Sequence, residues 1–284
     1  MTYGKERQTG DGNRMLNTGN TLTNFRAFTC WLTYAGLLAL VVGLAASKVS
    51  ANEYRISHCL MGCPQGAPAS NHLLIRPIYT LSYNPDHKSA DWVAYRVSAD
   101  TVGVASSLSR EPLDDGYGLD TLTASDFAGA QGLGMVRAHY VPLVSFAGTP
   151  YWNDVNYLSN AVARTSSLSQ GAWYGLDWAV RNLVNRQGEV YVLTGPIYRE
   201  GSGALTLPTS TPHRVPDGFF KLVANRDGQV AAFRFDQQTS VAVHHCERRT
   251  TLEQLQQETG LRLFPQMTGQ PGGSLYEALG CAGS

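Results

Sequence analysis

The chain has 284 residues, of which 43% are hydrophobic and 15% are charged. This composition allows a folded core and excludes an intrinsically disordered polymer. The chain has 22 Lys and Arg residues and 22 Asp and Glu residues. A uniformly basic surface for nucleic acid is therefore excluded, and phosphate binding requires a local cluster of basic side chains.

The first fifty residues differ in character from the rest. A polar start with several basic side chains precedes an uncharged run from Ala27 to Ser47. Such a run matches a bilayer-spanning helix or the apolar part of a secretory signal peptide. Because Val49-Ser50-Ala51 has the small residues that a signal peptidase reads, we predict that residues 1–51 are a signal peptide. The alternative is a membrane anchor retained at residues 27–47.

The remainder, residues 52–284, is predicted to form one domain outside the cytoplasm. We expect it to be secreted or periplasmic, with no membrane attachment after cleavage. It carries 17 basic and 20 acidic side chains, and 15 of the basic ones are Arg. The planar fork of Arg suits phosphate binding, so arginines are the first candidates for any anion site.

Cysteine usage agrees with export. Outside the apolar run there are four cysteines, Cys59, Cys63, Cys246 and Cys281. An even number in an exported chain predicts two disulfides, although the sequence alone permits three pairings. A zinc site is the alternative, but His58, His244 and His245 do not complete a standard ligand spacing.

The first half of the domain has the pattern of strands and loops. Leu73–Asn84 alternates β-branched and aromatic residues and predicts a strand, with Asp91–Val97 as its partner across the Asn84-Pro85-Asp86 turn. Residues 99–135 favour loop with short helices. Met135–Val144 is again typical of a strand.

The second half mixes helices with strands. Apolar residues at helical spacing predict a helix over Ser169–Val184. Glu189–Thr194 predicts a short buried strand that ends at Gly195-Pro196, and Phe219–Val223 with Val230–Phe235 predicts a hairpin. Thr251–Thr259 predicts a helix whose C-cap is Gly260. No βαβ rhythm appears, so the predicted class is α+β.

Several segments, in order, resemble the secreted Serratia-type DNA/RNA non-specific endonucleases. They are CLMGCPQGA, IRPIYTLSYN, DWVAYRV, PLVSFAG, NYLSN, QGAW, VYVLTGPIY and AAFRFDQ, and the similarity as a whole extends from about Cys59 to Cys281. The resemblance implies a central antiparallel sheet flanked by helices, a ββα-metal site, and disulfides Cys59–Cys63 and Cys246–Cys281. It further implies Mg²⁺, with Mn²⁺ as the alternative ion, DNA and RNA as substrates, 5′-phosphate products and a homodimer.

The family's site is a hairpin that carries Asp-Arg-Gly-His, followed by a helix whose Asn holds the metal. The hairpin motif here is Val136-Arg137-Ala138-His139, and the Asn position is Ser169. The resemblance therefore makes His139 the general base, because a neutral imidazole can take a proton from water near pH 7. Arg137 would bind phosphate and Ser169 would be the metal ligand.

Three further positions match functional residues of the family, and a fourth residue is a candidate. Asp177 occupies the position of a Glu in the family's helix, and Asn160 that of the Asn that follows the family's central strand. Arg181 occupies the position of a helix Arg that lies near the leaving group. For a phosphate-binding Arg before the hairpin the candidate is Arg110, although ungapped spacing places Leu108 there. Simpler interpretations also exist: an exposed Asp177–Arg181 helix pair, and Asn160 as a turn cap.

The departures from the family concentrate at the site. Ser169 is shorter than Asn and could serve only as an N-cap, Val136 replaces a carboxylate, and Ala138 replaces Gly. Ala163-Arg164 replaces the usual Pro-Gln. The alternative function is therefore a catalytically impaired, nuclease-like protein that binds nucleic acid.

Overall fold

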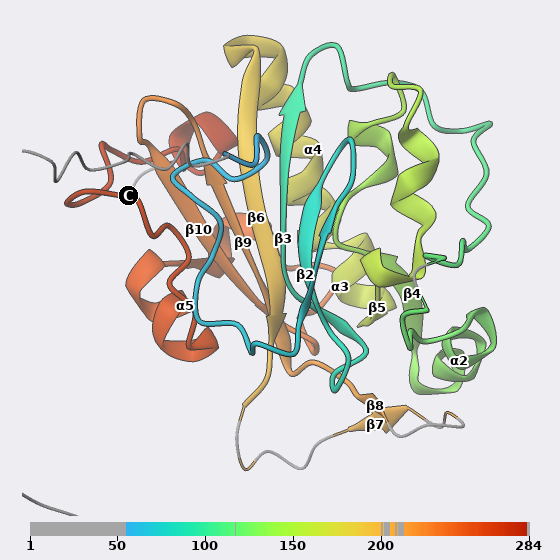
Figure 1. Cartoon of the computed structure of the whole chain (residues 1–284). Coiled ribbons are helices and arrows are strands. Elements are labelled where there is room, and N and C mark those ends of the chain that lie inside the picture. Colours follow the sequence, from blue (N-terminus) through green and yellow to red (C-terminus); the bar gives the residue numbers. More distant parts are fainter. Residues whose placement is uncertain are drawn as a thin grey trace, which may run out of the picture. The chain divides into compact units, whose positions relative to one another are not determined.

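A seven-stranded antiparallel sheet lies at the centre of the computed structural model, which describes residues 55–116, 118–199, 201, 205–207, 209 and 213–282 (Figure 1). The strand order is β1-β2-β3-β6-β9-β10-β11. The strands are β1 (His72–Ile75), β2 (Thr80–Asn84), β3 (Ser89–Ser98), β6 (Glu189–Ile197), β9 (Gly218–Ala224), β10 (Val230–Asp236) and β11 (Arg249–Thr250). The predicted signal segment lies outside the described residues.

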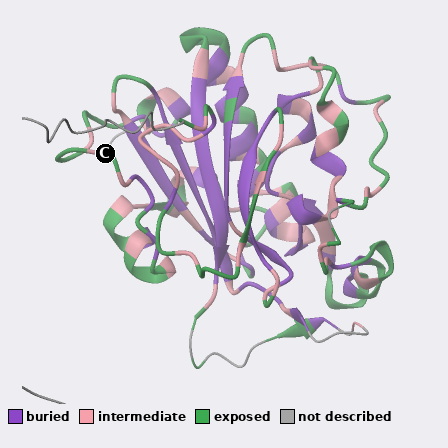
Figure 2. Ribbon diagram, viewed as in Figure 1, coloured by how far each residue is buried: buried purple, intermediate pink, exposed green. Residues whose placement is uncertain are grey.

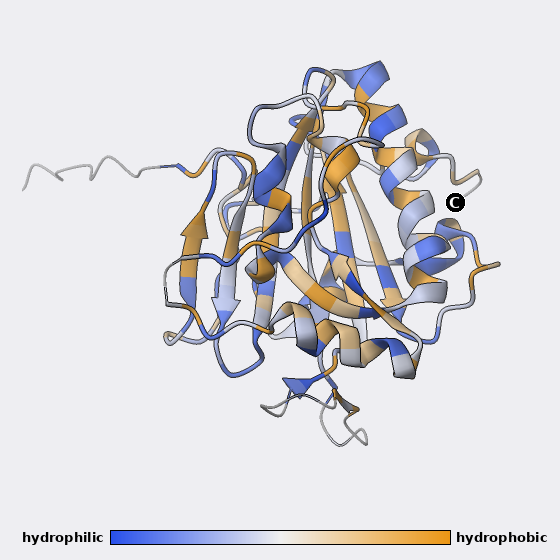
Figure 3. Cartoon of the chain, turned by 90° about the vertical axis from the view of Figure 1, so that its right-hand side faces the viewer, coloured by the Kyte–Doolittle hydropathy of each residue, from blue (hydrophilic) through white to orange (hydrophobic). Residues whose placement is uncertain are grey.

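Both faces of the sheet are covered, so its central strands are buried throughout (Figure 2). Successive side chains of a strand point to opposite faces. Phe219 belongs to the larger core with helix α4 (Ala172–Gln187), whereas the next residue, Phe220, packs in a second core with α5 (Leu252–Thr259). Figure 3 shows the strands largely in hydrophobic colours, as burial on two sides requires.

A separate hairpin, followed by a short helix, packs on the α4 side of the sheet. The hairpin is β4 (Met135–His139) with β5 (Ala161–Thr165), and α3 (Ser166–Gln170) follows β5 directly. The remaining elements are α2 (Ala124–Ala130), β7 (Thr206–Leu207), β8 (His213–Arg214) and the 3₁₀ helices η1 (Gln131–Leu133), η2 (Leu143–Ser145), η3 (Trp152–Asn156), η4 (Leu158–Asn160), η5 (His245–Arg248) and η6 (Glu277–Leu279). The α+β class and the hairpin-helix arrangement are confirmed.

The predicted single strand over Leu73–Asn84 is wrong. The chain forms two antiparallel strands there, β1 and β2, joined by a tight turn in which Arg76 N donates to Tyr79 O at 2.8 Å. Pro77 lies inside this turn, and a proline cannot donate to a sheet ladder. Met135–Val144 is also shorter than predicted, because β4 ends at His139.

The helix predicted over Ser169–Val184 is interrupted at Gly171, which separates α3 from α4. A Cβ on Gly171 would lie 2.8 Å from Val241 O and 2.9 Å from Ser167 O, so only glycine allows this close approach of the chain. The strand β6 is longer than predicted and passes through Gly195-Pro196 to Ile197.

Other local predictions are confirmed. The β9–β10 hairpin forms as expected, and so does the turn between β2 and β3. Helix α5 begins at a capping box, in which Thr251 Oγ1 accepts from Gln254 N at 3.1 Å, and it ends at Gly260 with a φ of 69°. These features depend on neighbouring residues alone.

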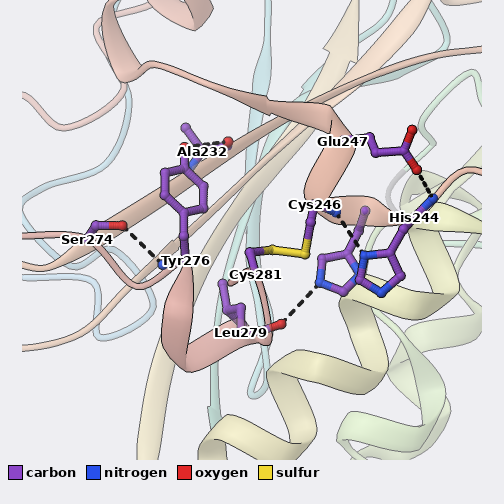
Figure 4. Close-up of a disulfide and its surroundings, with 9 residues drawn as sticks. Ala232, His244, Cys246, Glu247, Ser274, Tyr276, Leu279 and Cys281 are labelled. Carbon is purple, nitrogen blue, oxygen red and sulfur yellow. Dashed lines mark hydrogen bonds between the residues drawn. A yellow bond between two sulfur atoms is a disulfide. The ribbon is translucent and has the colours of Figure 1, made fainter. Parts of the chain in front are cut away.

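Both disulfides have the implied pairing, Cys59 with Cys63 and Cys246 with Cys281. Figure 4 shows the second of them beside His244 and Leu279. The ligand atoms of His244, His245 and Cys246 lie within 4.8 Å of one another. Since the Cys246 sulfur is in the disulfide, it supplies no thiolate for zinc. Within the described ranges, no helix has both the length and the apolar character needed to cross a membrane.

Candidate active site

The β4–β5 hairpin places His139 and Arg137 two residues apart on one strand, so both side chains project from the same face. Arg137 Nη2 donates to the backbone carbonyl of Arg110, and Arg110 itself is exposed. The structure thus brings together three of the residues predicted for the site. This includes Arg110, whose match to the family was loose in sequence.

His139 is half-buried at the end of β4, and its Nε2 atom is buried without a hydrogen-bond partner among the described residues. Burial, together with the positive charges of Arg137, Arg164 and Arg110, lowers the pKa of His139 to about 3. The imidazole is therefore neutral at physiological pH. A neutral ring with a free nitrogen can accept a proton from water.

Arg164, on the neighbouring strand β5, contacts the backbone carbonyl of His139. It is 4% exposed, its Nε donates to Ser169 Oγ at 3.1 Å, and its Nη2 contacts the His139 carbonyl at 3.4 Å. The guanidinium lies 4.1 Å from the centre of the Trp173 ring. Burial lowers the pKa of Arg164 to about 10, which leaves it protonated at neutral pH.

Gln237, beyond the end of β10, ties the junction of β5 and α3 to the main sheet. Its Oε1 accepts from Thr165 N at 2.9 Å, and its Nε2 donates to Ala163 O at 3.0 Å. Thr165 caps α3 by accepting from Leu168 N. The N-cap interpretation of Ser169 is therefore wrong, because Ser169 is inside α3 and its hydroxyl binds Arg164.

Asp177 on α4 forms a buried ion pair with Lys221 Nζ from β9. Asp177 is 7% exposed, Arg181 is 8% exposed, and Lys221 is wholly buried, so the interpretation as an exposed Asp177–Arg181 pair is wrong. Burial lowers the pKa of Lys221 to about 8, and Asp177 opposes this shift. Lys221 Nζ lies 3.9 Å from the centre of the Trp173 ring, which therefore contacts two cations.

Asn160 is fully buried, and backbone groups engage both ends of its amide. Its Oδ1 accepts from Val141 N at 3.1 Å, and its Nδ2 donates to Val155 O at 2.8 Å. These bonds hold the segment that follows His139. Asn160 is thus a positioning residue for that segment rather than a turn cap.

The site does not fit the divalent ion that the resemblance implies. The Ser169 oxygen already accepts a hydrogen bond from a guanidinium, and the Asp177 carboxylate is paired with Lys221. Mg²⁺ prefers carboxylate and water oxygens. At an effective dielectric of about 20, a divalent cation about 5 Å from one guanidinium is repelled by about 7 kcal/mol. The donor set around Ser169 is therefore cationic where an ion would need anionic oxygens.

Sequence reasoning gave no role to Arg164 or Lys221. The signal for Arg164 was present as the change from the family's Pro-Gln to Ala163-Arg164. For Lys221 there was no local signal, because a lysine within a buried strand is placed beside Asp177 only by the packing of α4 on the sheet.

Comparison with known proteins agrees with this architecture. The family model for DNA/RNA non-specific endonucleases matches residues 61–268. The chain is 35% identical to a nuclease from Serratia marcescens over 86% of this chain and 97% of that protein. It is 28% identical to a nuclease from Nostoc sp. over 69% and 74% of the two chains.

A solved structure has the same fold. The crystal structure of an EndoG/EndoGI complex aligns with a TM-score of 0.60 at 21% identity, covering 72% of this chain and 89% of that chain. At this identity the similarity concerns the fold, in which an antiparallel sheet carries the hairpin and helix of the site.

Proposed function

Since the chain belongs to the DNA/RNA non-specific endonuclease family and is a hydrolase of that kind, we propose that His139 activates the water that cleaves the phosphodiester bonds of DNA and RNA. The observation that carries this role is the buried, unbonded Nε2 of a neutral imidazole, as far as the described residues show. No other titratable group of the hairpin is uncharged at neutral pH and free to take a proton.

The step consumes one water. Its oxygen attacks phosphorus while its proton passes to His139 Nε2, and the bond from phosphorus to the 3′ oxygen breaks. The departing oxygen takes a proton from solvent. The products are a 5′-phosphate and a 3′-hydroxyl, and His139 then returns its proton to solvent.

Arginines would hold the phosphate. Arg137 Nη1 is buried and has no hydrogen-bond partner in the described part of the chain, and the exposed Arg110 lies beside it. Arg181 is the third candidate, from α4. Charge-assisted contacts to phosphate oxygens stabilise the charge that grows in the transition state. Because these contacts go to the backbone of the nucleic acid, cleavage would not depend on base sequence.

Asp177 and Asn160 would act through other groups. Asp177 neutralises Lys221, and Asn160 holds the backbone beyond His139. The family is one of divalent-metal-dependent nucleases. Mg²⁺ or Mn²⁺ was the ion implied for Ser169, but the hydrogen bond from Arg164 leaves that oxygen unsuited to either ion.

Two disulfides favour an exported protein, since such bonds persist in oxidising compartments. We expect a secreted or periplasmic enzyme after cleavage at Ala51, with an anchor at residues 27–47 as the alternative. N-terminal sequencing of the exported protein separates the two. A homodimer stays a prediction, which light scattering on the purified protein would test.

Digestion of plasmid DNA and of RNA tests the enzymatic function. Wild type should degrade both, and the new ends should accept a labelled phosphate only after phosphatase treatment. His139→Ala should lower the rate by about 10²- to 10⁴-fold. The matched control is His72→Ala, which alters an exposed histidine of β1. Full activity in His139→Ala would remove the proposed role, and a wild type that binds DNA without cutting it would establish the impaired alternative.

A further inference from the structure

Arg164 Nε donates to Ser169 Oγ, the atom that the resemblance makes the metal ligand. The inference drawn from this contact rests on the proposed nuclease function and deepens it. We propose that the Arg164 guanidinium replaces the divalent cation as the phosphate-binding charge, so that this enzyme acts without a metal ion. The ligand of Arg164 would be the scissile phosphodiester.

The guanidinium is held firmly on three sides. Ser169 Oγ accepts from Nε, the His139 carbonyl accepts from Nη2, and the Trp173 ring covers the plane. The remaining nitrogen, Nη1, is buried and finds no hydrogen-bond partner among the residues that the structure describes. A buried, charged N–H without an acceptor is costly, so this atom is suited to an anionic ligand.

A second guanidinium nitrogen has the same property. Arg137 Nη1 is also buried and unbonded within the described chain, as is His139 Nε2. Arg164 Nη2 lies 3.4 Å from the backbone carbonyl of His139, so this guanidinium adjoins the residue proposed as the base. Two guanidinium donors and a neutral base are the set needed to bind a phosphate oxygen and to deprotonate the attacking water.

The residue opposite Arg164 supports this assignment. Val136 pairs with Arg164 across the β4–β5 hairpin. A carboxylate at position 136, as in the family motif, could form an ion pair with the guanidinium and compete with phosphate. With valine there, the positive charge is not neutralised by the facing strand. The three changes from the family thus act together. Val136 removes an anion, Arg164 adds a cation, and Ser169 accepts a hydrogen bond from Arg164.

Chelation tests the proposal directly. Purified wild-type protein is incubated with plasmid DNA in excess EDTA, with and without prior dialysis against the chelator. We expect the cleavage rate to change by less than about twofold, since no ion supplies the charge. A loss of about tenfold or more that added Mg²⁺ or Mn²⁺ reverses would overturn the proposal.

The converse experiment uses a double variant that carries the family's residues at positions 164 and 169. Arg164→Gln with Ser169→Asn should bind Mn²⁺, seen by calorimetry or by the loss of free-ion EPR signal, and its cleavage should become sensitive to EDTA. Arg262→Gln is the control, because Arg262 is exposed and its neighbours Leu261 and Leu263 pack on the opposite face of the sheet. Circular dichroism melts establish that each variant folds.

The Mn²⁺ readout keeps this inference separate from the proposed function. Stoichiometric Mn²⁺ binding by wild type would overturn the role of Arg164 and leave the nuclease function intact. If wild type cut nothing under any condition, the proposed function would fail. An absence of Mn²⁺ binding in wild type and its appearance in the double variant would still show that Arg164 keeps the ion away from Ser169.

Discussion

Lys221 Nζ and the Asp177 carboxylate form a buried ion pair that joins β9 of the central sheet to helix α4. Lys221 Nζ also lies 3.9 Å from the centre of the Trp173 ring. Removing either charge from water costs free energy, and the attraction of the opposite charge offsets that cost.

Asp177→Asn should therefore lower the free energy of unfolding by about 3 kcal/mol, since it leaves the Lys221 ammonium buried without its carboxylate. Urea denaturation measures the loss. Adding Lys221→Met to Asp177→Asn should recover most of it. Asp114→Asn, at an exposed carboxylate, should stay within about 0.5 kcal/mol of wild type. Equal stability of Asp177→Asn and wild type would show that the pair does not stabilise the fold.

The pH dependence of cleavage should reflect the low pKa of His139, about 3. A base loses activity when it becomes protonated, so kcat/KM should show no acid limb near the ordinary histidine value of about 6.5. Arg137→Gln removes a positive charge that lowers this pKa, so the limb should move to higher pH in that variant. An acid limb near pH 6.5 in wild type would contradict the described environment of the imidazole.

Stability should fall as the solution is acidified. Burial lowers the pKa of His213 to about 4 and of His139 to about 3, and it also lowers the pKa values of His58 and His245. The unfolded chain binds protons at these residues below about pH 6.5 while the folded chain does not, which costs up to about 1.4 kcal/mol per pH unit for each imidazole.

Urea denaturation at a series of pH values measures this dependence. The stability present at neutral pH should be lost progressively below about pH 6.5, towards the folded-state pKa values. His213→Gln should flatten the slope, whereas His72→Gln, at an exposed position, should leave it unchanged. A slope that is identical in wild type and His213→Gln would argue against the buried, neutral state of that imidazole.

The two disulfides should differ in their contribution to stability. Cys246–Cys281 spans 35 residues and Cys59–Cys63 spans 4. From loop-closure entropy, replacing the longer bridge by two alanines should cost about 4 kcal/mol and replacing the shorter one about 2 kcal/mol. Thermal melts of the two double variants test the order. A larger loss for Cys59→Ala with Cys63→Ala would mean that local packing outweighs chain entropy.

Features that depend on adjacent residues could be predicted from the sequence. The hairpin and helix that carry His139 and Ser169 were expected from the family resemblance. The β9–β10 hairpin and helix α5 with its C-cap at Gly260 were expected from local patterns. Their signals are turn residues, caps and apolar periodicity, which act over a few positions. The disulfide pairing came from family resemblance, because spacing alone left three choices.

Features that depend on distant contacts could not be predicted in this way. The break at Gly171 exists because the Val241 carbonyl approaches it, and the turn inside Leu73–Asn84 reverses a segment that alternates like one strand. The same holds for the contacts that distinguish this site: Lys221 beside Asp177, and Arg164 bonded to Ser169. An ion pair or a buried donor is stable only where folding removes water and brings a partner within reach, so packing decided which charges met.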